Sequence, residues 1–154
     1  MINLKNKIAL ITGASRGIGK ASALYLAEAG ANIIINYHQT KNVDKLVRAC
    51  QKFKVKALSF KADVSSETDY RKMVEFAIKN FGKIDILVNN AGIATYAAID
   101  KMSNEILNET LDINLRGVFY LTREVVSYMK KQKSGNIINI SSTAGQRGEA
   151  YHSH

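Results

Sequence analysis

Short runs of β-branched and other apolar residues alternate along this chain with longer amphipathic segments. Between the runs, apolar residues recur every three or four positions, which predicts helices. Strands that alternate with helices are typical of a parallel sheet covered by helices on both faces. The apolar runs predict five buried strands, over residues 7–12, 31–36, 55–60, 84–88 and 136–140.

The amphipathic segments predict helices between these strands. One follows the first strand and contains Ala21 and Leu24. Cys50 lies in the apolar stripe of the second, so we interpret it as a small buried hydrophobe and not as a nucleophile. This second helix is expected over 43–53, and the remaining helices over 70–81, 104–113 and 115–131.

This order of elements predicts one doubly wound α/β domain of Rossmann-like type over residues 1–154. Right-handed crossovers would place the strands in the order 3-2-1-4-5. A ligand is then expected at the carboxyl ends of the first and fourth strands, where the direction of winding reverses.

The composition narrows the class of protein. A chain of 154 residues that is 46% hydrophobic has room for one domain with a sizeable core. No apolar run is long enough to span a membrane, and the N-terminus has no signal-peptide pattern. The single cysteine excludes a disulfide framework and a multi-cysteine zinc site, so we expect a cytoplasmic location.

The formal net charge is +9, which raises the question of a polyanionic partner. The lysines are spread along the sequence, and only Lys130, Lys131 and Lys133 form a cluster. No aromatic residues alternate with them in a nucleic-acid-binding pattern. We therefore interpret the charge as a solvated lysine surface and expect neither a nucleic-acid nor a membrane partner.

A glycine-rich segment lies directly between the first strand and the first helix. A glycine turn there lets the backbone approach a pyrophosphate, and the helix N-terminus offers N–H groups and a positive dipole end. Taken by itself the segment could also be only a tight turn. It reads Thr12-Gly13-Ala14-Ser15-Arg16-Gly17-Ile18-Gly19.

Further motifs follow the later strands: Asp63-Val64, Asn89-Asn90-Ala91-Gly92, and Asn136-Ile137-Ile138-Asn139-Ile140-Ser141-Ser142. Together with the glycine segment, this pattern resembles the classical short-chain dehydrogenase/reductase family over residues 4–148. The resemblance implies a seven-stranded fold whose last two strands this chain lacks. It also implies cofactor contacts at Gly13, Ser15, Arg16, Gly17, Ile18, Gly19, Asp63, Val64, Asn90, Ala91 and Gly92.

The end of the second strand bears on the choice of cofactor. An acidic residue there would accept a hydrogen bond from the 2′-hydroxyl of the adenosine ribose and would repel a 2′-phosphate. Here the strand ends in Asn36 and Tyr37 without a carboxylate, and the guanidinium of Arg16 can pair with a phosphate. We therefore expect NADP(H) and consider NAD(H) less favoured, while Asn36 could also serve a free hydroxyl.

Members of this family reduce carbonyls with a serine, a tyrosine, a lysine and an asparagine. The resemblance assigns the serine to Ser142 and the asparagine to Asn114, although each could instead be an ordinary cap. The family's tyrosine would fall one position beyond His154. Tyr151 stands too early and is interpreted as a loop residue, and His152 with His154 lacks a third ligand, so no metal site is expected.

The pattern is most like the 3-oxoacyl-acyl-carrier-protein reductase group, which implies a small-molecule or carrier-bound carbonyl substrate. Without the tyrosine and lysine, we expect the 154-residue chain itself to be inactive. The alternative is a non-catalytic nucleotide-binding fragment or a pseudogene product. The resemblance implies a homotetramer for a full-length form, and we expect the isolated chain to be poorly soluble.

Overall fold

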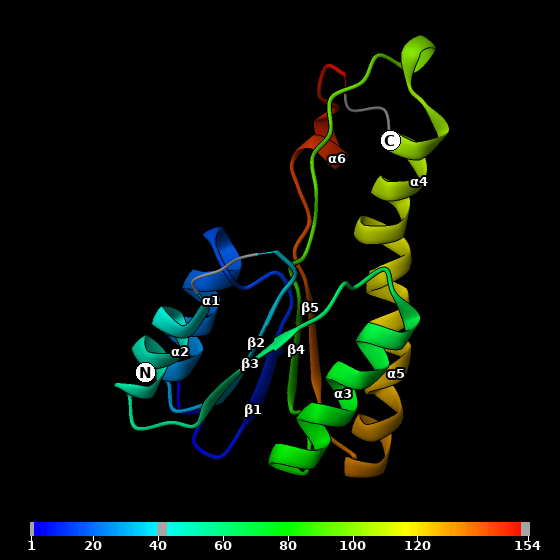
Figure 1. Ribbon diagram of the computed structural model, residues 1–154. Coiled ribbons are helices and arrows are strands. Elements are labelled where there is room, and N and C mark those ends of the chain that lie inside the picture. Colours follow the sequence, from blue (N-terminus) through cyan, green and yellow to red (C-terminus); the bar gives the residue numbers. More distant parts are fainter. Residues whose placement is uncertain (1, 40–42, 152–154) are drawn as a thin grey trace.

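The protein forms a single parallel sheet with helices on both sides (Figure 1). The computed structural model describes residues 2–39 and 43–151. The strand order is β3-β2-β1-β4-β5, which confirms the predicted order. The strands are β1 (Ile8–Ile11), β2 (Asn32–Tyr37), β3 (Ala57–Lys61), β4 (Ile86–Asn89) and β5 (Asn136–Asn139).

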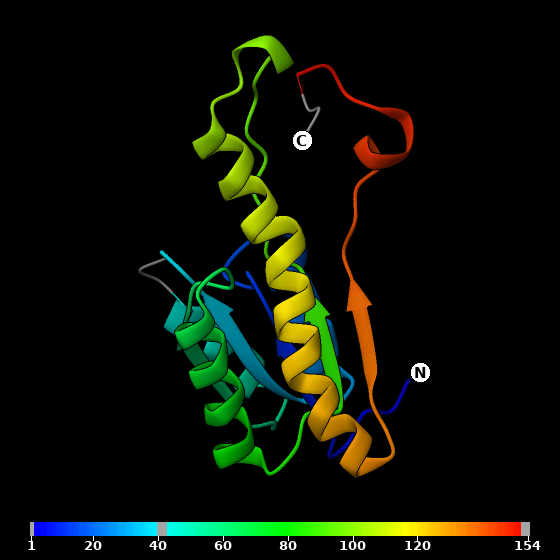
Figure 2. The same ribbon diagram turned by 90° about the vertical axis from the view of Figure 1, so that its right-hand side faces the viewer.

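Two layers of helices cover the sheet. On one face lie α1 (Gly17–Glu28) and α2 (Val43–Gln51), and on the other lie α3 (Glu67–Phe81) and α5 (Gly117–Gln132) (Figures 1 and 2). The shorter elements are α4 (Asn104–Leu111), a 3-10 turn over Ile99–Lys101, and α6 (Ala144–Arg147). The last two rise beyond the carboxyl ends of the strands (Figure 1).

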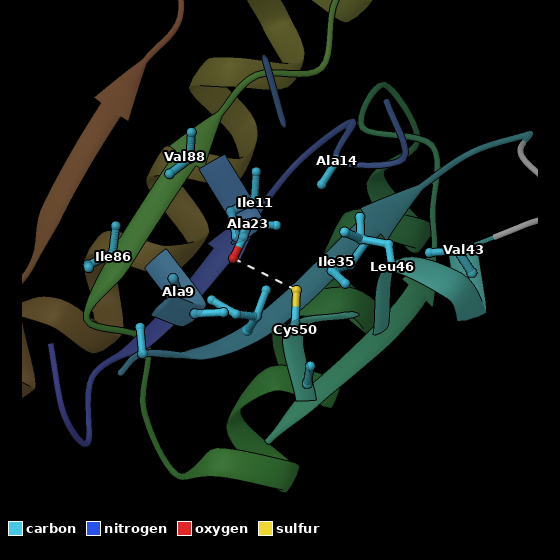
Figure 3. Packing of buried hydrophobic residues seen from close by; sticks show 14 residues of the cluster. Ala9, Ile11, Ala14, Ala23, Ile35, Val43, Leu46, Cys50, Ile86 and Val88 are labelled. Carbon is cyan, nitrogen blue, oxygen red and sulfur yellow. Dashed lines mark hydrogen bonds between the residues drawn. The ribbon is translucent and has the colours of Figure 1, made fainter. Parts of the chain in front are cut away.

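Alternating side chains of the strands supply the two cores. In β1, Ala9 and Ile11 pack toward α1 and α2, whereas Leu10 packs toward α3 and α5. Cys50 is fully buried in the first core, with its Sγ 3.8 Å from the carbonyl oxygen of Ala23 (Figure 3). Burial raises the pKa of this thiol, so the interpretation of Cys50 as a buried hydrophobe is confirmed.

The two helices predicted over 104–113 and 115–131 are one continuous helical run (Figure 2). A π-helical turn over Asp112–Arg116 joins α4 to α5, and the backbone keeps helical angles on either side of it. The prediction of a break was wrong because the wider turn takes up an extra residue without ending the helix. Asn114, the expected cap, lies inside that turn.

Strands β3 and β4 each begin two residues later than predicted. Before β4, the N–H and carbonyl of Ile84 bond to the side-chain amide of Gln132, at 3.3 and 3.0 Å, and not to a neighbouring strand. Strand β5 is the last strand in the sheet order and forms an edge of the sheet, where Ile138 is 45% exposed.

Within the described ranges, no helix is long and apolar enough to cross a membrane.

Candidate nucleotide-binding and catalytic site

The structure brings the predicted site residues to one edge of the sheet, where the strands have their carboxyl ends. Backbone bonds tie the segments there together: Ala14 N–H donates to Asn36 O at 2.8 Å, and Ile140 N–H donates to Asn89 O at 2.9 Å. The β1–α1 loop lies between the ends of β2 and β4. This is the switch point at which doubly wound sheets bind ligands.

Two glycines let the β1–α1 loop pass close to the segment after β4. Gly13 has a φ of +58°, and a Cβ built on it would lie 2.8 Å from the Cα of Ala91. A Cβ on Gly19 would lie 2.5 Å from the Nδ2 of Asn90 and 2.9 Å from the Cα of Ala14. Neither position has room for a side chain, so the backbone itself forms the surface of the loop.

The N-terminus of α1 is suited to an anion. The first N–H groups of a helix lack intrahelical partners, and the helix dipole makes this end positive. Arg16 occupies the N-cap position but makes no side-chain cap hydrogen bond, and the first turn contains no acidic residue. Gly17 has open space around it and a φ of +54°. A pyrophosphate therefore fits this end of the helix in both charge and space.

Asn36 fixes the glycine loop to the sheet. Its side chain is buried, and its Oδ1 accepts from Gly13 N–H at 3.1 Å while its Nδ2 donates to Ala62 O at 3.0 Å. The amide is thus engaged inside the protein on both of its ends. A direct contact between Asn36 or Tyr37 and a cofactor stays a prediction.

The segment after β3 forms the wall next to this loop. The Oδ1 of Asp63 accepts from the N–H and the hydroxyl of Ser65, at 2.9 and 2.6 Å, while its Oδ2 lies 3.8 Å from the Nε2 of His38. Val64 is buried, and its carbonyl oxygen would lie 3.0 Å from a Cβ on Gly117. A glycine inside α5 therefore lets that helix approach the wall.

Thr12 is a site residue that the sequence analysis did not assign. Its buried hydroxyl oxygen accepts from the N–H groups of Asn90 and Ala91, at 2.9 and 3.0 Å, and donates to Val88 O at 3.3 Å. The Nδ2 of Asn90 in turn donates to the carbonyl oxygens of Thr12 and Gly13. The signal was a hydroxyl residue at the last position of a buried strand, next to the first glycine.

Asn114 and Ser142 occupy the outer part of the same edge. In its π-helical turn, Asn114 bonds through its amide to the backbone of Ile93, next to Gly92. Ser142 is exposed between β5 and α6, and its Oγ accepts from Ala144 N–H at 3.1 Å. Asn114 therefore does not cap the helix. Its pair of hydrogen bonds to Ile93, which we call the Asn114 clamp, joins the π-helical turn to the segment after β4. Ser142 does form the expected local hydrogen bond in a turn.

Tyr151 is the last residue that the structure describes. Tyr151 lies outside the helices, is 65% exposed, and accepts from Ala97 N–H at 3.0 Å through its carbonyl. His152, Ser153 and His154 lie outside the described residues. Among the residues that are described, no group of three or more His, Cys, Asp or Glu side chains could hold a metal ion.

A sequence profile of the short chain dehydrogenase family matches residues 7–154. The chain belongs to this family. It is 39% identical over 147 residues to the 3-oxoacyl-acyl-carrier-protein reductase FabG of Thermotoga maritima. It is 41% identical over 149 residues to the 3-oxoacyl-acyl-carrier-protein reductase of Synechocystis. In both comparisons the match covers 96% of this chain and 60% of the relative, so the chain spans about 60% of these family members' length.

Solved structures of family members share the fold. An NAD+-bound xylitol dehydrogenase superposes with a TM-score of 0.92 at 33% identity, covering 97% of this chain and 58% of that one. A Serratia marcescens short-chain dehydrogenase/reductase with two Phe-to-Tyr substitutions gives 0.88 at 34% identity, covering 94% and 58%. The Rossmann-like arrangement expected from the sequence is therefore that of the family.

Proposed function

We propose that the protein is the cofactor-binding part of an NADP(H)-dependent oxidoreductase that reduces a carbonyl to an alcohol. The observation that carries the proposal is the N-terminus of α1, where Arg16 makes no side-chain cap hydrogen bond, beside a loop in which Gly13 and Gly19 pack against the segment after β4. Such a loop can hold a pyrophosphate. The family membership supports a nicotinamide dinucleotide as the bound group.

The preference for NADP(H) rests on charge at the end of β2. Tyr37 and His38 follow Asn36 there, and no carboxylate stands among them to repel a 2′-phosphate. Arg16 is exposed at the start of α1, where its guanidinium can pair with that phosphate. The nearby carboxylate of Asp63 is engaged on both oxygens, because its Oδ1 accepts two hydrogen bonds from Ser65 and its Oδ2 lies 3.8 Å from the Nε2 of His38.

When bound, the nicotinamide would supply the hydride. Ser142 would orient the substrate, because its oxygen accepts from Ala144 N–H while its own proton can be donated to a carbonyl oxygen. Asn114 would hold the segment beside Gly92 in position through Ile93. Tyr151 is not proposed as the proton donor to the alkoxide, because its position after Ser142 does not match the family pattern.

The substrate class is proposed from the relatives. Two of them are named 3-oxoacyl-acyl-carrier-protein reductases, which favours a 3-oxoacyl thioester carried by a protein or a small-molecule analogue of it. We further propose that a full-length form assembles as a homotetramer. Leu115 and Phe119, 49% and 67% exposed, give the helical run around α5 an apolar outer surface that such an assembly would cover.

The second candidate is a non-catalytic nucleotide-binding fragment or pseudogene product, which would keep the glycine loop at Gly13 and Gly19 and bind the cofactor without turnover. Reading the coding DNA past codon 154 separates the two. An in-frame tyrosine at the next codon, with a lysine four codons later, supports the reductase, and a stop codon supports the fragment. For the 154-residue chain we expect NADPH binding without oxidation in the presence of an acetoacetyl thioester, and turnover would contradict that expectation.

A further inference from the structure

The charge of the protein is concentrated at the amino edge of the sheet, opposite the nucleotide site. In this topology each helix before a strand ends at that edge, together with the connection into the strand (Figure 1). We call the surface formed by residues 2–7, 28–31, 48–56, 79–85 and 130–135 the lysine face. It contains eleven of the 22 basic residues and two of the 13 acidic ones, so it accounts for the whole net charge of +9.

Most of this charge is exposed. Of the two acidic residues, Asp85 is buried and pairs with Lys7 and Lys83, at 3.4 and 2.9 Å, whereas Glu28 lies at the end of α1. Lysines at helix C-termini are favoured by the helix dipole, which explains those in the last turns of α3 and α5. The dipole does not explain the lysines in the connections, such as Lys52, Lys54 and Lys56.

An apolar side chain projects from the same face. Phe53 is 42% exposed in the turn after α2, between Lys52 and Lys54. The turn is tight: Lys54 has a φ of +62°, and its N–H donates to Gln51 O at 2.9 Å. Ile2, on the segment before β1, is 76% exposed. Exposed apolar side chains among lysines are the features with which proteins bind the headgroup region of anionic membranes.

We propose that the lysine face docks the protein on an anionic lipid bilayer, with Phe53 at the headgroup boundary and the nucleotide site facing the solvent. Ten of the eleven basic residues are lysines, which act as point charges suited to a diffuse negative surface. Only one aromatic side chain is exposed on the face, so it lacks the stacking rows of a single-strand binder.

This proposal goes beyond the enzymatic function and departs from the expectation of no membrane partner. That expectation relied on the lysines being scattered in the sequence. The sheet topology gathers these scattered lysines, because every connection into a strand reaches the same edge. The nucleotide site is not involved, so cofactor binding and membrane binding can be tested separately.

Flotation with lipid vesicles tests the proposal, since aggregated protein sinks and bound protein rises. We expect the chain to float with vesicles of phosphatidylcholine and phosphatidylglycerol but not with phosphatidylcholine alone, and to be released by salt. Changing Lys52, Lys54, Lys130 and Lys131 to Gln should weaken partitioning about 100-fold or more, because each lysine near the surface contributes about fivefold. Phe53→Ser should weaken it about tenfold at unchanged charge.

The matched control changes Lys45, Lys61, Lys72 and Lys101 to Gln, four exposed lysines outside the lysine face. It should weaken partitioning much less than the face variant. Equal losses in the two variants, or equal binding to neutral vesicles, would overturn the proposal. Tighter retention on a double-stranded oligonucleotide than on vesicles at the same salt would assign the face to nucleic acid and overturn it as well. Circular dichroism and NADPH titration check that each variant is folded.

Discussion

The side-chain amide of Asn114 and the backbone of Ile93 bond to each other in both directions. The Oδ1 of Asn114 accepts from Ile93 N–H and its Nδ2 donates to Ile93 O, each at 2.9 Å. The amide thereby pairs with the backbone as a neighbouring strand would. It connects a π-helical turn, a feature often found at functional sites, to the segment that follows β4.

Replacing Asn114 with Ala removes both bonds of this clamp. We expect the free energy of unfolding to fall by about 1 kcal/mol, because the bonds are exposed and water replaces them in part. Amide exchange at Ile93 should accelerate more than the change in global stability explains. Asn108→Ala, an exposed asparagine in α4, is the control, and equal exchange at Ile93 in both variants would rule out the clamp.

Asn36→Leu tests the attachment of the glycine loop. The change leaves the N–H of Gly13 and the carbonyl of Ala62 without their present partner, so we expect a loss of about 2–3 kcal/mol in urea unfolding. Asn32→Ala in the same strand is the control, because the Oδ1 of Asn32 accepts an exposed bond from Lys56 N–H. A smaller loss for Asn36→Leu than for Asn32→Ala would be inconsistent with this role.

Gly19→Ala should disturb the nucleotide site without adding charge. The new methyl group would meet the amide of Asn90 at 2.5 Å and the backbone of Ala14 at 2.9 Å, so the loop must shift. We expect NADPH affinity to fall by about tenfold or more, measured by titration. Gly145→Ala, where a Cβ meets nothing within 4 Å, should bind NADPH like the unmodified protein. Unchanged affinity of Gly19→Ala would show that the close packing does not shape the site.

The buried carboxylate of Asp85 should make the free energy of unfolding depend on pH in the acidic range. Burial raises the pKa of Asp85, but hydrogen bonds from Lys83 and Ile8 N–H, with the charges of Lys83 and Lys7, outweigh it and leave the pKa below its ordinary value of 3.8. A carboxyl group whose pKa is lower in the folded protein than in the unfolded chain stabilises the fold at pH values above its ordinary pKa. This stabilisation is lost as the pH falls. We expect the free energy of unfolding to decrease below about pH 4.

Asp85→Asn should flatten this acid dependence, measured by urea unfolding at a series of pH values. The exposed Glu75, changed to Gln, is the control and should leave the slope in place. If Asp85→Asn kept the same slope as the unmodified protein, the acid dependence would come from other carboxyl groups.

The sheet was predictable because its signal is local and repeated. Runs such as Ile33-Ile34-Ile35 are apolar at consecutive positions, as expected for a strand buried on both faces, and the alternation with helices determines a parallel order. The π-helical turn was not predictable. Its sequence, Asp112 to Arg116, has no proline or glycine that would mark a change of helix type, and the residue that its Asn114 contacts, Ile93, lies 21 positions away in the sequence.

In the candidate site too, residues in a local motif were predictable and residues brought together only by the fold were not. Gly13 and Gly19 were identified because a glycine motif is visible in the sequence itself. The role of Thr12 was missed because its partners, Asn90 and Ala91, lie 78 and 79 positions away and are defined only by the fold. The lysine face was missed for a similar reason, since residues from separate connections gather only when the sheet forms.

Titration of the purified chain with NADPH and with NADH tests the central claim most directly. We predict that NADPH binds about tenfold more tightly or better, because Arg16 can pair with the 2′-phosphate and no carboxylate at the end of β2 opposes it. Arg16→Ala should remove most of this difference while leaving NADH affinity nearly unchanged. NADH binding as tight as or tighter than NADPH binding would contradict the account.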